Sequence, residues 1–261
     1  MAIPIFKVDA FTASVFGGNP AAVCPLDGWL PADVLQSMAK ENNLSATAFF
    51  VRNGHGAIDL RWFTPACEVE LCGHATLATA SVLFREFGVE QDALRFQTKS
   101  GELVVTKRGE LFVMNLPARP PAPTEVCPNL LPALAGPSPQ EILAARDYVL
   151  RYRSEDEVRK LCPNMEELKQ VDRFAVIVTA PGEDCDFVSR FFAPAKGIPE
   201  DPVTGSAHCT LTPYWANHFA KAELHARQIS ARGGELFCTL LGDRVEIAGR
   251  AALFLKGQIT I

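Results

Sequence analysis

Several protein classes are disfavoured by what the sequence lacks. No run of about eighteen apolar residues occurs among its 261 residues, so no membrane-spanning helix is expected. The basic residues are scattered and the formal net charge is −5, so there is no Lys/Arg stripe of the kind that neutralises nucleic-acid phosphates. The first residues also lack the basic and apolar regions of an export signal. We therefore expect a cytoplasmic protein with no membrane or nucleic-acid partner.

The eight cysteines lack the spacings of metal sites. They stand at positions 24, 67, 72, 127, 162, 185, 209 and 238, and none forms a Cys-x-x-Cys pair. Zinc sites commonly use that pair, so we expect no metal. A disulfide framework is disfavoured in a chain of this length without an export signal. Most of the cysteines are interpreted as buried thiols.

Length and composition favour two compact lobes. The chain is 48% hydrophobic and 21% charged, which is typical of an ordered globular protein. Eight prolines stand between positions 117 and 139, and a segment so poor in backbone donors is not expected to continue a sheet or a helix. The predicted lobes are residues 1–118 and 119–261, with the last strand as a candidate for pairing with the first lobe.

Hydrophobic patterns predict strands and two enclosed helices. Residues 74–87 are apolar almost all round before Gly88, and a second apolar helix is predicted from residue 204 to about 222. A shorter helix is predicted at 31–40, where apolar residues form one stripe. The predicted strands include residues 3–10, 58–63, 103–106, 111–116, 148–152, 174–179, 187–192, 244–248, 251–255 and 258–261. The two halves are interpreted as structural repeats.

Each long helix is preceded by a glycine-containing turn. The turns are Cys72-Gly73-His74 and Thr204-Gly205-Ser206. The start of a helix carries unpaired backbone donors and partial positive charge, and glycine lets a ligand approach the backbone closely. Two such ends facing one another would suit a carboxylate or an enolate-like anion. A simple turn is the alternative for either one.

Three side chains near these turns are candidates for proton transfer. Asp201, beside Glu200, is interpreted as a general acid/base or, equally, as an electrostatic partner of the helix start. His74 lies in the first turn of its helix, where the dipole favours a neutral ring that can accept or donate a hydrogen bond. Cys72 is a thiolate candidate at a helix start or an inert buried thiol.

Six short strings together resemble the PhzF (phenazine biosynthesis-like) isomerase family. They are Val8-Asp9-Ala10-Phe11-Thr12, Gly18-Asn19-Pro20-Ala21-Ala22-Val23, Asn43-Leu44-Ser45, Arg61-Trp62-Phe63-Thr64-Pro65, Leu71-Cys72-Gly73-His74-Ala75-Thr76 and Glu200-Asp201-Pro202-Val203-Thr204-Gly205. The resemblance implies an α+β, diaminopimelate epimerase-like fold. In that fold two similar lobes each wrap a β-barrel-like sheet around a central helix, and the active site lies in the cleft between them. It also implies an isomerase that needs no cofactor and forms a homodimer.

Carried over to this sequence, the resemblance assigns the proton-handling positions to Ala46, His74, Asp201 and Ser206. The candidate substrate-binding residues are Asn19, Ser45, Cys72, Gly73, Thr204 and Gly205. The expected substrate is a small cyclic or hydroxylated amino or carboxylic acid.

One position departs from the family pattern. Ala46 stands where the family has a glutamate that takes and returns the substrate proton, and a methyl group can do neither. Loss of a positioned base typically costs about 10²- to 10⁴-fold in rate. Three accounts remain open: an engineered inactive variant, a natural member that uses another base, and a member that binds without turnover.

Three other functions fit the same fold. A racemase or epimerase would use one cysteine from each lobe, but Thr204 stands at the second position and is not a usable base at neutral pH. A single base at Cys72 would instead suit a hydroxy-amino-acid dehydratase. A non-catalytic binding protein that kept the fold is the third hypothesis.

Overall fold

The computed structural model describes residues 1–53 and 57–261, which form two compact units. The first unit comprises Met1–Asn115 with Ala248–Ile261, and the second comprises Leu116–Ile247. The sequence-based division placed residues 119–261 in the second lobe, with the last strand as a candidate for pairing with the first lobe, and the structure shows that pairing for residues 251–260. Residues 248–261 belong to the first unit because the last strand, β17 (Ala251–Thr260), pairs antiparallel with β1 (Ala2–Ala10) along its whole length.

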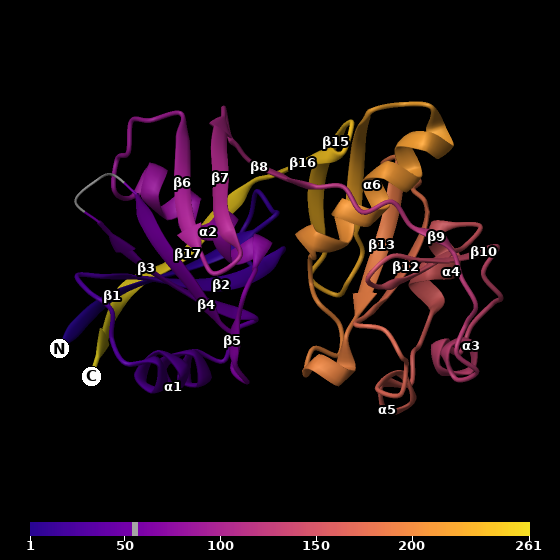
Figure 1. Cartoon of the computed structure of the whole chain (residues 1–261), viewed down its shortest axis with the longest axis horizontal. Helices are drawn as coiled ribbons and strands as arrows, with labels where there is room; N and C mark the ends of the chain where they lie inside the picture. Colours follow the sequence, from indigo (N-terminus) through magenta and orange to yellow (C-terminus); the bar gives the residue numbers. More distant parts are fainter. Residues whose placement is uncertain (54–56) are drawn as a thin grey trace. The chain divides into compact units, whose positions relative to one another are not determined.

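The first unit is a set of strands arranged around one helix (Figure 1). Its elements are β1, β2 (Asn19–Leu26), α1 (Ala32–Asn42), β3 (Ala46–Arg52), β4 (Ile58–Phe63), β5 (Glu68–Val69), α2 (Gly73–Arg85), β6 (Ala93–Thr98), β7 (Gly101–Arg108), β8 (Leu111–Pro117), which extends past the boundary of the unit, and β17. β2 pairs antiparallel with β1 and parallel with β3, and β3 pairs antiparallel with β4. β5 and β6 both pair with β4, and β7 joins β6 to β8. The helix and strands expected at residues 31–40, 3–10 and 58–63 are therefore present.

α2 is the enclosed helix of the first unit. Every residue from His74 to Phe84 is buried, and the helix packs against β1, β2, β3, β7 and β17. A helix that is apolar all round can be stable in water only if other structure covers all its faces. The expectation of an enclosed helix at residues 74–87 is confirmed, and its first charged residue, Arg85, marks its end.

The second unit repeats this arrangement around α6 (Gly205–Phe219). Its other elements are β9 (Ala122–Pro123), α3 (Leu130–Leu134), β10 (Glu141–Ala144), β11 (Tyr148–Arg151), α4 (Glu155–Lys160), α5 (Met165–Leu168), β12 (Val176–Pro181), β13 (Phe187–Phe192), a 3-10 turn (Pro194–Lys196), β14 (Glu223–Gln228), β15 (Gly234–Leu241) and β16 (Arg244–Gly249). α6 is buried along most of its length and packs on β14 and β15. The proline-rich segment does contain a helix, α3, contrary to expectation, because Pro132 falls in its first turn, where no intrahelical N–H bond is lost.

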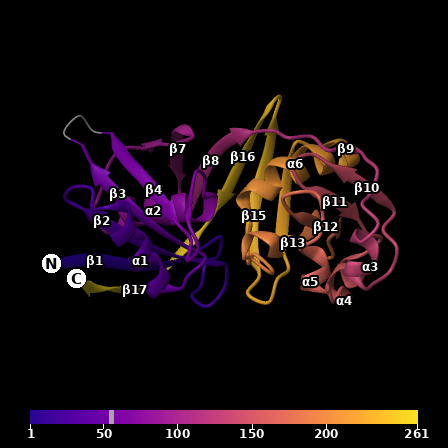
Figure 2. The same cartoon turned by 60° about the horizontal axis from the view of Figure 1, so that its bottom comes forward.

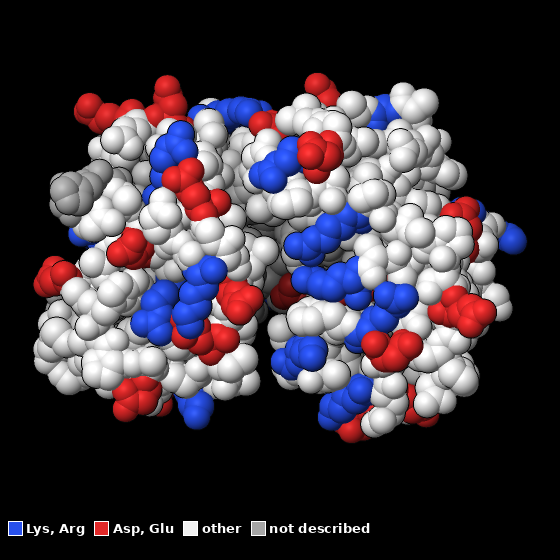
Figure 3. All heavy atoms as spheres, viewed as in Figure 1, with Lys and Arg blue, Asp and Glu red and all other residues white. Residues whose placement is uncertain are grey.

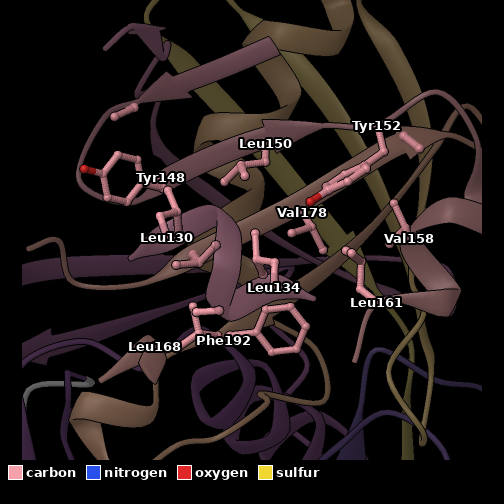
Figure 4. Close-up of a cluster of buried hydrophobic side chains, with 14 of the residues drawn as sticks. Leu130, Leu134, Tyr148, Leu150, Tyr152, Val158, Leu161, Leu168, Val178 and Phe192 are labelled. Atoms are coloured by element: carbon pink, nitrogen blue, oxygen red, sulfur yellow. The ribbon is translucent and has the colours of Figure 1, made fainter. Parts of the chain in front are cut away.

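In the second unit, an apolar cluster lies on the face of the strands that is opposite to α6. Figure 4 shows Tyr148, Leu150 and Val178 from the strands packed against Leu134 of α3 and Val158 of α4. α3 and α5 are in contact, and Figures 1 and 2 show them together on the outside of the second unit. The strands of this unit are thus covered on one face by α6 and on the other by short helices.

The described part of the chain has no helix that is both long and apolar enough to cross a bilayer. Its surface carries charges of both signs. In the first unit, for example, Glu68 pairs with both Arg61 (2.8 Å) and Lys99 (2.7 Å), and Figure 3 shows basic and acidic side chains next to one another on this unit.

A glycine controls the turn that joins β1 to β2. Gly18 has a φ of +60°, and a Cβ placed on it would lie 2.1 Å from the carbonyl oxygen of Ala10. We expect Gly18→Ala to lower the free energy of unfolding by about 3 kcal/mol, because both the conformation and the space exclude a side chain. Urea unfolding measures this value. Gly28→Ala is the matched control, since a Cβ placed on Gly28 would have no neighbour within 4 Å, and equal effects of the two changes would contradict the prediction.

Candidate active site

In the first unit, strand register brings the candidate residues of two loops to one edge of the sheet. Asn19 begins β2 opposite Ala10, the last residue of β1. Ala46 begins β3 opposite Ala21 of β2. Because β2 and β3 run parallel, the starts of both strands, and Ser45 just before β3, lie at the same edge. Asn19 and Ala46 are both fully buried.

The start of α2 is held near this edge by β4 and β5. Thr47 pairs with Phe63 at the end of β4, and Trp62 pairs with Val69 of β5. Gly73 follows Val69 by four positions, a span of at most about 14 Å. The first-unit candidates, from the loops before β2 and β3 and from the helix start, therefore share one end of the unit.

His74 is a neutral ring at this end. It is 8% exposed, and burial lowers its pKa to about 4, because a charged imidazolium loses its hydration there. The Cys72 sulfur lies 3.5 Å from His74 Nδ1. A neutral imidazole can accept a proton at one nitrogen while it donates from the other, so this side chain suits proton transfer.

In the second unit, the loop before α6 is fixed by hydrogen bonds. Asp201 is 8% exposed, and its Oδ2 accepts a hydrogen bond from Thr204 Oγ1 at 2.5 Å. Its backbone N–H donates to Phe191 O on β13 at 3.0 Å. The neighbouring Glu200 forms a two-pronged ion pair with Arg190 (2.8 and 3.0 Å), so its charge is largely balanced by that guanidinium.

The loop also rests on a buried glutamine. Gln228, at the end of β14, accepts a hydrogen bond from the Thr204 backbone N–H (2.9 Å) and donates to Asp201 O (2.7 Å) and Thr204 Oγ1 (3.2 Å). Ser230 Oγ donates to Pro202 O at 2.8 Å. Both ends of the 201–204 segment are therefore anchored to the same turn after β14.

The starts of α2 and α6 have matching geometry. Their N-cap residues, Cys72 and Thr204, are both extended, with φ and ψ of −144° and 97° and of −119° and 95°, and neither side chain caps its own helix. Four residues on, Thr76 Oγ1 donates to Cys72 O (2.7 Å), and His208 Nδ1 lies 2.9 Å from Thr204 O. At neither helix start does an N-cap side chain accept a hydrogen bond from the first backbone N–H groups. These N–H groups are therefore suited to bind an anion.

His208 lies directly beneath the second helix start. It is fully buried, and burial lowers its pKa to about 4. Because its Nδ1 donates to a carbonyl oxygen, the neutral ring carries its proton there and Nε2 is left as an acceptor. Among the described residues Nε2 has no hydrogen-bond partner.

The family model described as phenazine biosynthesis-like protein matches residues 8–257. The chain belongs to the phenazine biosynthesis-like family. An uncharacterized isomerase of Pseudomonas aeruginosa is 49% identical over 259 residues and is covered to 99%, as is this chain. The crystal structure of a PhzF-family phenazine biosynthesis protein from Enterococcus faecalis is 46% identical, with a TM-score of 0.97 and 100% of both chains covered.

The same fold extends beyond the phenazine biosynthesis-like family. A hydroxyproline epimerase from Agrobacterium vitis, solved with trans-4-hydroxy-L-proline, is 12% identical, with a TM-score of 0.60 over 99% of this chain and 92% of that one. At this identity the likeness concerns the fold. The expected α+β, diaminopimelate epimerase-like fold is therefore confirmed.

The structure distributes the predicted site residues over the two units. Asn19, Ser45, Ala46, Cys72, Gly73 and His74 are in the first unit, and Asp201, Thr204, Gly205 and Ser206 are in the second. Sequence reasoning missed Gln228 and His208. Gln228 had a usable signal, because Leu224, Ala226 and Gln228 alternate with charged residues and predict one buried face of a strand.

Metal and disulfide chemistry find no support in the described residues. No group of three or more His, Cys, Asp or Glu side chains in residues 1–53 and 57–261 could hold a metal ion. All eight cysteines lie in this part of the chain and are free thiols.

The two buried histidines make stability depend on pH. Their pKa values are near 4 in the folded protein and about 6.5 when unfolded, so the unfolded chain binds more protons between these values. Stability is fully present above about pH 6.5 and is lost as the pH falls toward 4, by up to about 3 kcal/mol for each ring.

We expect His208→Phe to remove the contribution of one of the two rings, up to about 3 kcal/mol, from the change in the free energy of unfolding with pH. Urea unfolding between pH 4 and 7.5 measures the slope. His218→Gln is the control, because His218 is exposed on the same helix. A slope unchanged by His208→Phe would show that this ring does not stay neutral in the folded protein.

Proposed function

We propose that this protein is an isomerase that moves a proton within a small cyclic or hydroxylated amino or carboxylic acid. The isomerase class follows from its family. The observation that carries the substrate class is the pair of matching, uncapped helix starts at Gly73 and Gly205. Unpaired backbone N–H groups with the positive end of the helix dipole favour a carboxylate and an enolate-like intermediate.

In the proposed mechanism the proton is carried by side chains, without a cofactor. Asp201 removes or returns it, with Oδ2 held by Thr204. The neutral ring of His74 donates or accepts on the substrate, and Ser206, half-buried in the first turn of α6, supplies a further hydroxyl. Proton transfer by positioned groups of this kind typically contributes about 10²- to 10⁴-fold each.

The same proposal includes the absence of one base. Ala46 occupies the position of the family glutamate and its methyl group is fully buried at the start of β3, where it offers no proton acceptor. We propose that turnover is therefore slow or absent while carboxylate binding is retained. We also propose a cytoplasmic homodimer without nucleic-acid or membrane partners, whose mass light scattering would measure.

The hydrogen bonds of Thr204 argue against a two-base racemase. Its hydroxyl proton is donated to Asp201, and its oxygen accepts from Gln228. A racemase needs a base on each face of the substrate, and this hydroxyl is not available as the second one. A dehydratase with Cys72 as its single base remains the alternative, and the contact of 3.5 Å between Cys72 Sγ and His74 Nδ1 favours it.

Ala46→Glu should create or raise isomerase activity by about 10²- to 10⁴-fold, because it restores a carboxylate at the position of the family base. Deuterium incorporation from D2O into a panel of cyclic and hydroxylated amino acids, followed by NMR, measures the rate. Ala46→Gln is the matched control, with the same size and no proton acceptor of comparable basicity. The proposal fails if parent and both folded variants exchange at the same rate.

Cys72→Ala separates the proposed mechanism from the dehydratase. If only the backbone near Cys72 is used, the exchange rate of the Ala46→Glu protein should fall less than about 10-fold. If the thiol is the base, we expect a loss above about 10³-fold. Asp201→Asn is the reference for loss of a proton-transfer group.

The non-catalytic alternative predicts that no carboxylic acid shifts the backbone amide signals of Gly73 and Gly205 in labelled protein.

A further inference from the structure

Gln228 is an unusual side chain for the core of the second unit. It is 0% exposed at the end of β14. A buried amide has two donor hydrogens and an acceptor oxygen, and each costs free energy if it is left without a partner. The hydrogen bonds that it makes therefore indicate what it is there to hold.

The hydrogen bonds of its side chain go to one short segment, residues 201–204. Oε1 accepts from the Thr204 N–H at 2.9 Å, and Nε2 donates to Asp201 O at 2.7 Å and to Thr204 Oγ1 at 3.2 Å. These partners fix the orientation of the amide, since an N–H must face an acceptor and a carbonyl oxygen must face a donor. The amide supplies one acceptor and two donor contacts from a single planar group, and all of them are used here.

The hydrogen bond from Gln228 Nε2 to Thr204 Oγ1 sets the direction of the hydrogen bond between Thr204 and Asp201. Because Thr204 Oγ1 accepts from Gln228, its one proton is directed to Asp201 Oδ2, at 2.5 Å. A chain of hydrogen bonds thus runs from Gln228 through Thr204 to one oxygen of the Asp201 carboxyl. Such chains polarise and orient their members more strongly than separate hydrogen bonds do.

We propose that Gln228 is a positioning residue, which holds the Asp201 carboxyl in the one orientation that proton transfer requires. The inference rests on the proposed function of Asp201. Gln228 acts in two ways: it orients the Thr204 hydroxyl, and it ties the backbone of residues 201 and 204 to β14. A misplacement of a reacting group by about 1 Å can cost about 10²-fold in rate.

The surroundings of Gln228 are rigid enough for this role. Its strand neighbour Ser189, on β13, lies directly opposite it in register, and the next residue, Ile229, donates its N–H to Ser189 O at 2.8 Å. Ser230 holds Pro202 O at 2.8 Å. The end of β14 and the turn after it therefore support the loop at two points, Gln228 and Ser230.

The test compares two replacements of Gln228 in the Ala46→Glu protein. Gln228→Met keeps the length and removes all hydrogen bonds. We expect kcat for proton exchange to fall about 10²-fold while KM changes less than about 3-fold, because the change leaves in place the backbone donors at Gly73 and Gly205 that are proposed to bind the carboxylate. The control is Thr212→Val. Thr212 is also fully buried, but it lies on α6, and its replacement should leave kcat within about 2-fold. A parent-like kcat in Gln228→Met, or an equal loss in the control, overturns the proposal.

Gln228→Glu gives a signature that a purely structural role would not produce. Its carboxyl has nearly the same shape, but when ionised it places an acceptor against Asp201 O and Thr204 Oγ1. When protonated it regains the donor. We expect the rate relative to the parent to rise as the pH falls, and a ratio that is independent of pH overturns the proposal. This result remains informative if Gln228→Met does not fold.

A measurement without substrate separates this inference from the proposed function. If no compound exchanges its proton in any variant, the proposed function fails. Hydrogen exchange of the Thr204 backbone amide then tests Gln228 alone. We expect Gln228→Met to lower its protection at least about 10-fold, with the Leu211 amide in the helix interior as the reference. Unchanged protection at Thr204 would show that Gln228 does not hold this loop.

Discussion

A helix that is surrounded by strands can meet a ligand only at its ends, and this constraint governs both units. α2 is buried from His74 to Phe84, and the exposed residues of α6 lie in its last turn, from 217 to 219. The unpaired donors of each helix are concentrated at its N-terminus. The candidate residues accordingly gather before and within the first turn, at Cys72 and His74 in one unit and at Asp201 and Ser206 in the other.

The two helix starts differ in how their side chains are supported. In the second unit, Asp201 is held through Thr204 by Gln228, so its orientation is set before any ligand arrives. In the first unit, the corresponding edge of the sheet carries the buried methyl group of Ala46, and the ring of His74 is kept neutral by burial. The two helix starts therefore differ at the first residue of β3, where a methyl group stands in place of a carboxylate.

Local sequence patterns predicted the elements that depend on local chemistry. The apolar runs of α2 and α6 and the alternation in β4 identified those elements, and the glycine turns identified the helix starts. β17 was predicted as two strands around residues 256 and 257, because Lys256-Gly257 does not fit a strand by itself. Its pairing with β1, including a register shift between Lys7 and Val8, supplies the missing stabilisation from the other end of the chain.

The candidate site was predictable to a similar degree. Motif strings located its two turns and the substitution at Ala46. They did not locate Gln228, because this residue stands 24 positions from Thr204 and can reach it only when β14 packs beside α6 in the folded chain. Hydrogen-bond partners of this kind are set by tertiary structure, and a single sequence shows them at most as a polar residue in an otherwise apolar alternation.

The pairing of β17 with β1 has a consequence for biosynthesis. Leu116–Ile247 lie between the two parts of the first unit, so a ribosome completes the whole second unit before it delivers the strand that covers β1. Until then β1 has β2 on one side and an open edge on the other, and open edges recruit other chains. The first unit therefore stays incomplete until this strand arrives, whereas all of Leu116–Ile247 precede the strand in the chain.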